Sequence, residues 1–201
     1  MALRSARLLL RPLDAHDATF VESLRADARV TRTLLRIQRP ISIEEAREVF
    51  QVPTPAGGEH RFGAGLQTDS TLIALGSVRW RAELSNVATT GYSVLPAIWG
   101  LGYGTELAAL LVQFAAGTLG AREIRATTQD DNPASASVLE KLSFTILEAR
   151  TSEIDSRGDE RRVTRWALNG GLGGRAAAEH KASSGPARHR PLSLSGQADE
   201  R

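Results

Sequence analysis

Three glycines occupy alternate positions in the stretch AIWGLGYGTEL, residues 97–107, just before a run of leucines. Gly100, Gly102 and Gly104 have no Cβ atom, so an anion can approach the main chain closely there. The leucines predict a helix, and the free N–H groups at a helix N-terminus favour negative charge. The Thr105 hydroxyl adds a donor. This pattern predicts a loop that binds phosphate or pyrophosphate; a glycine-rich connector that serves only close packing is the alternative.

Two common phosphate motifs do not fit this loop. A P-loop needs a lysine after its last glycine, whereas Gly104 is followed directly by Thr105. A dinucleotide fingerprint, GxGxxG, matches Gly100 and Gly102 but has Thr105 in place of its third glycine. Glu123 stands near the distance expected of a ribose ligand, which keeps a nicotinamide nucleotide open as the weaker alternative. That fingerprint belongs to a parallel βαβ unit, however, and the segment before this loop has an antiparallel pattern.

A second candidate group is the segment NPAS, residues 132–135. Asn132 is typical of a helix N-cap and Pro133 of the first helical position. Ser135 then lies in the first helical turn, where its hydroxyl can donate or accept a hydrogen bond. A local capping role alone would also explain these residues.

The composition excludes several kinds of chemistry. The chain of 201 residues has no cysteine, so disulfides, thiolate metal sites and acyl-cysteine intermediates are excluded. Its histidines are too scattered for metal ligation, and no metal is predicted. They are His16, His60, His180 and His189. The early apolar run Leu8 to Leu10 is too short for a membrane span or a secretory signal, so we expect a cytoplasmic protein without a membrane partner.

The charge and composition change near residue 170. Residues 1–170 carry 20 Lys or Arg and 20 Asp or Glu, whereas residues 171–201 carry five and three, which accounts for the net charge of +2. The segment 171–201 is rich in Gly, Ala, Ser and Pro and lacks aromatic residues, so it is predicted to be a disordered tail. We expect one domain over 1–170 and no nucleic-acid partner.

The elements follow one another in a mixed order, which favours an α+β domain over a doubly wound sheet. A strand over 7–13 precedes a helix that follows Asp14, and Ser42 with Glu45 predicts a capping box at the start of a second helix. Short β-rich runs from 62 to 94 predict an antiparallel meander. The later predicted elements are a helix over 102–119, a strand over 123–129, a helix over 133–142, and strands over 144–154 and 161–168.

The spacing Trp99-x-x-Gly102-x-Gly104 resembles the acetyl-CoA pyrophosphate loop of the GCN5-related N-acetyltransferases (GNAT). Trp99, in place of the usual Gln or Arg, is similar to the branch that includes the ribosomal-protein alanine and serine N-acetyltransferases. Other segments resemble that branch in order, roughly from residue 7 to 168. They are RLLLRPL, VTRTL, SIEEAREVF, GYSVLPAIWGLGYGTE and NPASASVLEKLSF.

This resemblance implies a mixed, mostly antiparallel sheet of about seven strands with about four helices. The sheet would open between its fourth and fifth strands to take the pantetheine arm of acetyl-CoA. Backbone groups of Val94 and Leu95 would pair with that arm, and Asn132 would lie beside it. Ser135 would donate a proton to the departing CoA thiolate. The cofactor-binding loop would comprise Trp99, Gly100, Leu101, Gly102, Tyr103, Gly104 and Thr105.

Three positions depart from the family pattern. Leu139 stands where many relatives have a tyrosine that acts as general acid, so Ser135 or water would replace that phenol. Ser143 stands at a usual glycine position and would cost stability if the backbone there has a positive φ. Thr89 and Thr90 stand where relatives often have a glutamate, which leaves no obvious general base.

A missing base favours an acceptor amine that loses its proton easily. An α-amino group with a pKa of about 7.8 is about 14% neutral at pH 7, whereas a lysine side chain is only about 0.04% neutral. Glu83, His60 or a water relay remain candidate bases. We therefore expect direct acetyl transfer to a primary amine, foremost a protein N-terminal α-amine, by a monomer or homodimer. The alternatives are transfer to a small molecule such as an antibiotic or polyamine, and a non-catalytic acyl-CoA sensor.

Overall fold

The computed structural model describes residues 2–36, 42–51, 58–81, 86–156 and 158–169. The predicted tail, 171–201, and the candidate base Glu83 lie outside these residues. None of the helices in the described ranges is long and apolar enough to cross a membrane.

Within the described part of the chain, eight strands form one mixed sheet in the order β1-β2-β3-β4-β5-β6-β8-β7. All neighbouring strands are antiparallel except the parallel pair β5 and β6. The sheet has one strand more than expected because a two-residue strand, β1, pairs with β2 at its edge. The strands are β1 Leu3–Arg4, β2 Leu8–Pro12, β3 Glu59–Leu66, β4 Leu72–Arg81, β5 Val87–Val94, β6 Glu123–Gln129, β7 Thr145–Ile154 and β8 Glu160–Asn169.

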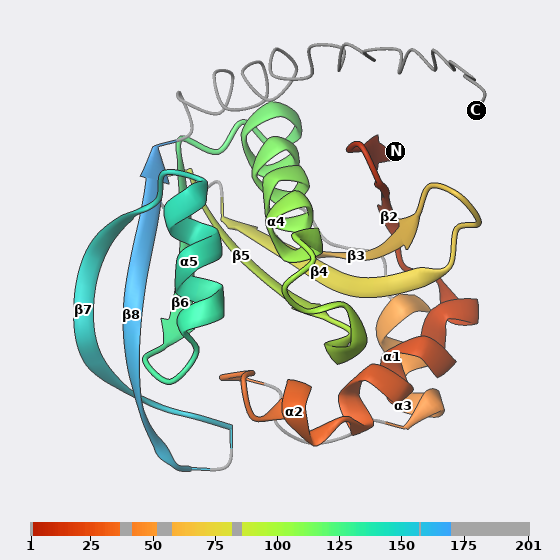
Figure 1. The fold of residues 1–201 in the computed structure, drawn as a ribbon, viewed down its shortest axis with the longest axis horizontal. Helices are drawn as coiled ribbons and strands as arrows, with labels where there is room; N and C mark the ends of the chain where they lie inside the picture. Colours follow the sequence, from red (N-terminus) through yellow and green to blue (C-terminus); the bar gives the residue numbers. More distant parts are fainter. Residues whose placement is uncertain (1, 37–41, 52–57, 82–85, 157, 170–201) are drawn as a thin grey trace, which may run out of the picture.

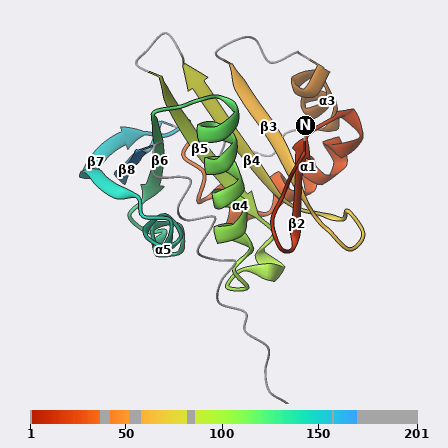
Figure 2. The same cartoon turned by 90° about the horizontal axis from the view of Figure 1, so that it is seen from above.

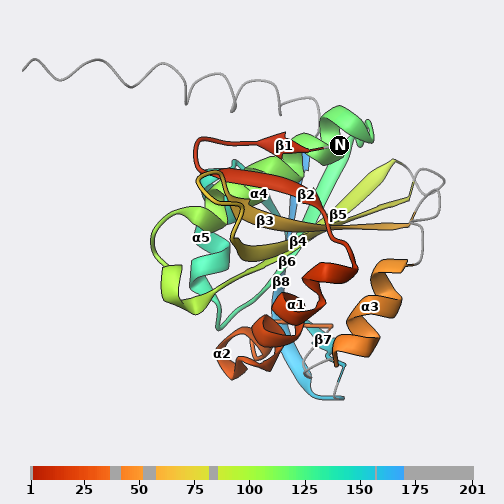
Figure 3. The same ribbon diagram turned by 90° about the vertical axis from the view of Figure 1, so that its right-hand side faces the viewer.

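The helices cover both faces of the sheet, with α1, α2 and α3 on one face and α4 and α5 on the other (Figure 2, Figure 3). Short turns of 3₁₀-helix precede α1 and α4, and a π-helical turn, Phe114–Thr118, follows α4. The α-helices in the described residues are α1 Ala18–Ala26, α2 Ala28–Thr31, α3 Ile43–Gln51, α4 Tyr103–Gln113 and α5 Pro133–Lys141.

Alternation along β4 divides the core between the two faces. Ala74 and Val78 point to the cluster that contains α4, whereas Leu75 points to the cluster formed by α1 and its neighbours. Leu111 of α4 is fully buried against β4, and burial of such a side chain contributes about 1.5–3 kcal/mol. The close approach needs Gly76, because a Cβ there would lie 2.9 Å from Leu111 Cδ1.

The sheet opens between β5 and β6, as expected. These strands pair only over Val87–Thr89 and Glu123–Arg125 and then diverge, which Figure 1 shows at the centre of the molecule. The opening falls between the fifth and sixth strands rather than the fourth and fifth only because β1 adds one to the count. The following parts of β5 and β6 therefore form the two walls of an opening.

Most predicted elements agree with the structure. The strand over 123–129 is β6, the meander is β3 to β5, and the Ser42–Glu45 capping box forms through both of its hydrogen bonds. The helix expected over 102–119 ends as an α-helix at Gln113, because the last turn is π-helical. The four-residue α2 was not predicted; Asp27 caps it by accepting from the Arg29 N–H.

Ser143, just after the C-terminus of α5, has a strained backbone conformation. Ser143 has a φ of 64° and follows the C-cap residue Leu142. Its N–H donates to Glu140, and the Phe144 N–H donates to Leu139, which is the Schellman pattern of a helix end. Glycine normally occupies this left-handed position because a Cβ is strained there. The expected strain at this departure from the family pattern is therefore present.

Replacing Ser143 by glycine is expected to raise the free energy of unfolding by about 0.5–1 kcal/mol, because the relief of strain exceeds the extra flexibility of the unfolded chain. The Ser143 side chain is exposed, so no packing is lost. Urea unfolding measures the difference. Ser143→Ala keeps the Cβ and serves as the control with no gain; equal stability of the two variants would contradict the prediction.

Candidate active site

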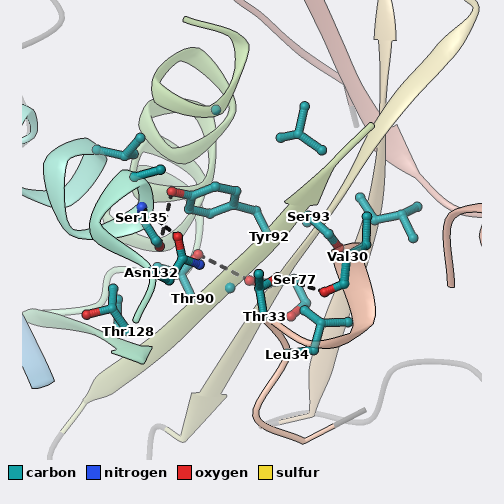
Figure 4. Close-up of a pocket in the computed structure, with 18 of the residues that line it drawn as sticks. Val30, Thr33, Leu34, Ser77, Thr90, Tyr92, Ser93, Thr128, Asn132 and Ser135 are labelled. Atoms are coloured by element: carbon teal, nitrogen blue, oxygen red, sulfur yellow. Dashed lines mark hydrogen bonds between the residues drawn. The ribbon is translucent and has the colours of Figure 1, made fainter. Parts of the chain in front are cut away.

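The opening between β5 and β6 continues into a cavity of about 1170 Å³. Its walls are formed by β4, β5 and β6, by the N-termini of α4 and α5, and by the segment around α2. Figure 4 shows Asn132 and Ser135 on one side of this cavity, Tyr92 at its centre, and Val30, Thr33 and Leu34 across from them. The cavity therefore joins both predicted groups of residues, the glycine loop and the start of α5.

The glycine loop forms the N-terminus of α4, as predicted. Gly100 and Gly102 have φ values of 80° and 85°, and Gly102 is the N-cap of α4. The backbone N–H groups of Gly100, Gly102, Tyr103 and Gly104 have no backbone acceptor within the described residues. Several unpaired donors at a helix N-terminus form a site that favours an anion. Gly100, Gly102, Gly104 and Thr105 all line the cavity.

Trp99 joins this loop to the end of β5. Its indole Nε1 donates to the Val94 carbonyl at 2.8 Å, while the ring remains largely exposed. Leu101, at the outer tip of the loop, is also exposed and does not line the cavity. Of the predicted loop residues, Leu101 is thus the one whose side chain faces away from the site.

An arginine that the sequence analysis missed stabilises the outer side of the loop. Arg7 Nη1 donates to the Leu101 carbonyl at 3.0 Å, and Arg7 Nε pairs with Glu106 at 2.6 Å. The guanidinium also lies over the Tyr103 ring, 4.0 Å from its centroid. Ser5 completes the cluster by donating to Glu106. Arg7 lies about a hundred residues from the loop in sequence, so only the fold could bring them together.

The end of β5 corrects one expectation about the pantetheine contacts. The Leu95 N–H donates to the Ile73 carbonyl of β4, and the Leu95 carbonyl accepts from the Ile98 N–H. Both backbone groups of Leu95 are therefore engaged within the protein. Alternation along the antiparallel ladder turns the backbone groups of Val94 and Tyr92 away from β4, toward the opening. The Val94 N–H is therefore positioned to pair with an occupant, whereas the Val94 carbonyl already accepts from Trp99 Nε1.

At the start of α5, Asn132 caps the helix as predicted, because its side chain accepts from the Ser135 N–H at 3.2 Å. The Ser135 hydroxyl lies 3.4 Å from the hydroxyl of Tyr92. Burial raises the pKa of the Tyr92 phenol, and the contact with Ser135 partly opposes this effect. The phenol therefore keeps its proton at neutral pH. A tyrosine reaches Ser135 from β5, although none occupies the helix position at Leu139.

One other candidate group, His60, lies elsewhere. His60 of β3 packs its ring edge-on against Phe114, on the face covered by α4, and does not line the cavity. Burial lowers the pKa of His60, but its position excludes direct contact with an acceptor in this cavity. Among the described residues, no three His, Asp or Glu side chains gather as a metal site would require.

Comparison with known proteins identifies the family of this chain. Residues 7–145 match the model of the acetyltransferase (GNAT) domain. The chain belongs to the GNAT family. It is therefore an N-acetyltransferase that uses acetyl-CoA as its co-substrate, and its glycine loop, with four unpaired N–H groups, suits the pyrophosphate of that molecule.

Individual relatives agree with this assignment. The GNAT enzyme is 28% identical over 145 residues to an uncharacterized N-acetyltransferase, YoaA, of Bacillus subtilis; the match covers 71% of this chain and 81% of that protein. A GNAT acetyltransferase from Bacillus anthracis shares the fold with a TM-score of 0.73 at 19% identity, covering 85% of this chain and 99% of that one. A spermidine N-acetyltransferase from Vibrio cholerae in complex with CoA and spermine gives 0.75 at 18% identity, covering 84% and 99%.

For this GNAT enzyme, two glycine-to-alanine changes are expected to differ. In Gly102→Ala, the Cβ meets a φ of 85° and lies 3.3 Å from Arg7 Nη2. We expect the free energy of unfolding to fall by about 1–2 kcal/mol and CoA affinity to fall about tenfold. Gly117→Ala is the control, because Gly117 is exposed, does not line the cavity, and would bring its Cβ within 4 Å of no described atom.

The control variant is expected to match the parent in stability and in CoA affinity to within about threefold. Thermal unfolding and isothermal titration calorimetry with CoA measure both quantities. Normal CoA affinity in Gly102→Ala, or equal loss in the two variants, would count against this loop as the pyrophosphate site.

Proposed function

We propose that this enzyme acetylates the α-amine at the N-terminus of a peptide or protein, like the ribosomal-protein N-acetyltransferases that it resembles. The supporting observation is the lack of a buried general base among the described residues that line the cavity. These include no histidine, and their carboxylates are Glu59, Asp131 and Glu153. Glu59 and Glu153 are ion-paired with arginines, and Asp131 is exposed.

Without a base, the acceptor itself must supply the neutral amine that attacks the thioester. An α-amine with a pKa near 7.8 does so in about 14% of molecules at pH 7, several hundred times more often than lysine. The difference in pKa corresponds to about 3.5 kcal/mol of additional cost for a lysine acceptor. This arithmetic favours an N-terminal amine over a lysine side chain.

In the proposed complex, the unpaired N–H groups of the glycine loop hold the pyrophosphate, and Val94 pairs with the pantetheine arm. Asn132 lies beside this arm while it caps α5. Acetyl-CoA supplies an activated acyl group as a thioester. The Tyr92 N–H, which also faces the opening, is suited to stabilise the negative charge that develops on the carbonyl oxygen.

The Ser135 hydroxyl is proposed to donate a proton to the departing thiolate, with Tyr92 acting through it. If the Tyr92 phenol donates to Ser135 Oγ across their 3.4 Å contact, the serine proton is free to point into the cavity. Tyr92 then orients Ser135 and can replace the proton that it gives up. A water molecule would return the proton to Tyr92.

A polyamine is the alternative acceptor, since the spermidine N-acetyltransferase of Vibrio cholerae shares this fold in more than one of its solved structures. Their identities of 19% and 18% support a common fold only. A panel of acceptors separates the two proposals.

The function is tested with purified protein, acetyl-CoA and short peptides that carry a free N-terminus and one lysine. Mass spectrometry is expected to find the acetyl group on the α-amine. Because only the neutral amine reacts, kcat/KM is expected to rise about tenfold per pH unit below the amine pKa and to level off near pH 8. The matched control peptide has an acetylated N-terminus and should not react. Exclusive transfer to lysine or to spermidine, or a profile that is flat from pH 6 to 8, would overturn the proposal.

Ser135→Ala is expected to lower kcat about tenfold or more, with the affinity for acetyl-CoA changed less than about threefold. Tyr92→Phe keeps the ring beside Gly104 and should cause a smaller loss. If Tyr92 acts only through Ser135, the double variant will be no slower than Ser135→Ala alone. Additive losses would instead show that the two hydroxyls act independently, and an unchanged kcat in Ser135→Ala would exclude its role as proton donor.

A further inference from the structure

One face of the sheet beside the opening has two rows of residues that run across β3, β4 and β5, and both rows contain charged side chains. In the first row, Glu59, Arg79 and Thr89 are neighbours across β3, β4 and β5. In the second row, Arg61, Ser77 and Gly91 are neighbours. Because alternate residues of a strand share a face, these rows point to the same side as Leu75, the side covered by α1.

The two rows lead directly to the opening. Gly91 is exposed, and a Cβ built on it would meet no atom of the described residues within 4 Å, so these residues leave the space above it open. It stands just past Thr89, where β5 stops pairing with β6. Arg61 is two strands away in the same row, about 10 Å at ordinary strand spacing. If the amine of a peptide acceptor lies above Gly91, a side chain a few residues further along that peptide can therefore reach this charged surface.

Arg25, in the last turn of α1, brings a further positive charge to the same cavity. Its Nε and Nη1 atoms are buried and have no hydrogen-bond partner among the residues that the structure describes. Burial lowers the pKa of its guanidinium, Glu59 opposes this effect and Arg61 adds to it. The side chain as a whole is half-buried, but burial of these two donors is costly, since they have lost water and gained no acceptor in return. The cavity thus contains donors that an anion would satisfy.

The nearest carboxylate does not meet this need. Glu59 already accepts from Arg61 at 2.8 Å and pairs with Arg79 at 3.4 Å. Of the described residues that line the cavity, six are basic and three are acidic. The basic residues are Arg25, Arg32, Arg36, Arg61, Arg79 and Lys141.

We propose that Arg25, with Arg61 and Arg79, binds a carboxylate of the acceptor, so that the enzyme selects peptides with an acidic side chain at the second or third position. This inference rests on the proposed function, because it assigns a substrate class to that same site. The amine lies above Gly91 and the carboxylate lies beside the Arg25 guanidinium, which turns toward the cavity so that Nε and Nη1 gain an acceptor. Arginine suits this contact because its fork of donors matches a carboxylate.

The same charges disfavour polyamines. A polycation that placed one amine above Gly91 would bring its remaining ammonium groups toward Arg25 and Arg61. At short distances in a partly desolvated cavity, this repulsion opposes binding and selects against such acceptors. Charge therefore distinguishes this cavity from one that accepts spermidine.

The test compares C-terminally amidated tetrapeptides that differ only by Asp or Asn at position two or three. For the parent enzyme, we expect kcat/KM to be about tenfold higher for the better Asp peptide than for its Asn counterpart. Free alanine tests whether the α-carboxylate of an amino acid can serve instead, and spermidine tests the polycation. Release of the CoA thiol measures each rate.

Arg25→Met should reduce the Asp-to-Asn ratio to about one. Arg122→Gln, which removes an exposed arginine that does not line the cavity, is the matched control and should keep the ratio. Arg25→Met is also expected to unfold at no lower temperature, because a buried thioether carries no unpaired charge. Loss of the ratio through general misfolding would lower that temperature and the CoA affinity together.

The outcomes separate the two proposals. Equal rates on Asp and Asn peptides would overturn the role of Arg25 and leave N-terminal acetylation standing. A preference for free alanine would place the carboxylate on an amino acid rather than a peptide, and it would overturn the peptide assignment. Acetylation of spermidine with no reaction on any peptide would overturn both proposals. The Asp-to-Asn comparison on the parent enzyme needs no variant, so a variant that fails to fold leaves the test intact.

Discussion

The fold depends on a sheet whose pairing stops part-way between two parallel neighbours. After Thr89 and Arg125, β5 and β6 no longer exchange hydrogen bonds, yet both strands continue. Buried backbone donors and acceptors must be satisfied, so a strand left without its neighbour either faces water or receives another partner. The N-terminus of α4 adds further unpaired N–H groups at the same opening. These two sets of main-chain groups explain why an extended molecule with a diphosphate suits this family.

The two faces of the sheet serve different purposes around this opening. The face of α4 and α5 carries the glycine loop, Tyr92 and Ser135, which are the groups proposed to hold the acyl donor and assist its leaving group. The opposite face carries Arg25, Arg61 and Arg79, which are proposed to hold the acceptor. Strand alternation produces this separation, because neighbouring residues of one strand point to opposite faces. On this proposal, the two substrates react at the gap beyond Thr89, where the two faces of the sheet are connected.

Local patterns in the sequence were sufficient for most elements. The capping box at Ser42, the cap at Asn132 and the alternating residues of β6 each involve neighbours a few positions apart, and all three are present in the structure. The glycine loop was found because its signal is also local. The opening and its position came from the family resemblance, since nothing in a single strand indicates where its neighbour departs.

The remaining features depend on contacts between distant residues. Tyr92 and Ser135 are 43 residues apart, so their proximity has no local signature. The hydrogen bond from Leu95 to Ile73 depends on strand register. The hydrophobic pattern does not determine that register, because registers that differ by two residues place the same side chains on the same face. In the sequence, Arg25 looks like any arginine of an amphipathic helix. Only the structure shows that its Nε and Nη1 have no hydrogen-bond partner among the described residues.

The attachment of Arg7 to Leu101 and Glu106 has a consequence for the order of folding. These contacts span 94 and 99 residues and join the start of the chain to the middle. Closure of so long a loop is entropically costly, and such contacts form slowly compared with the hairpins of β3 to β5. The hairpins and helices can therefore assemble before the glycine loop is held in place. We therefore expect the nascent chain to form these hairpins and helices before it becomes able to bind CoA.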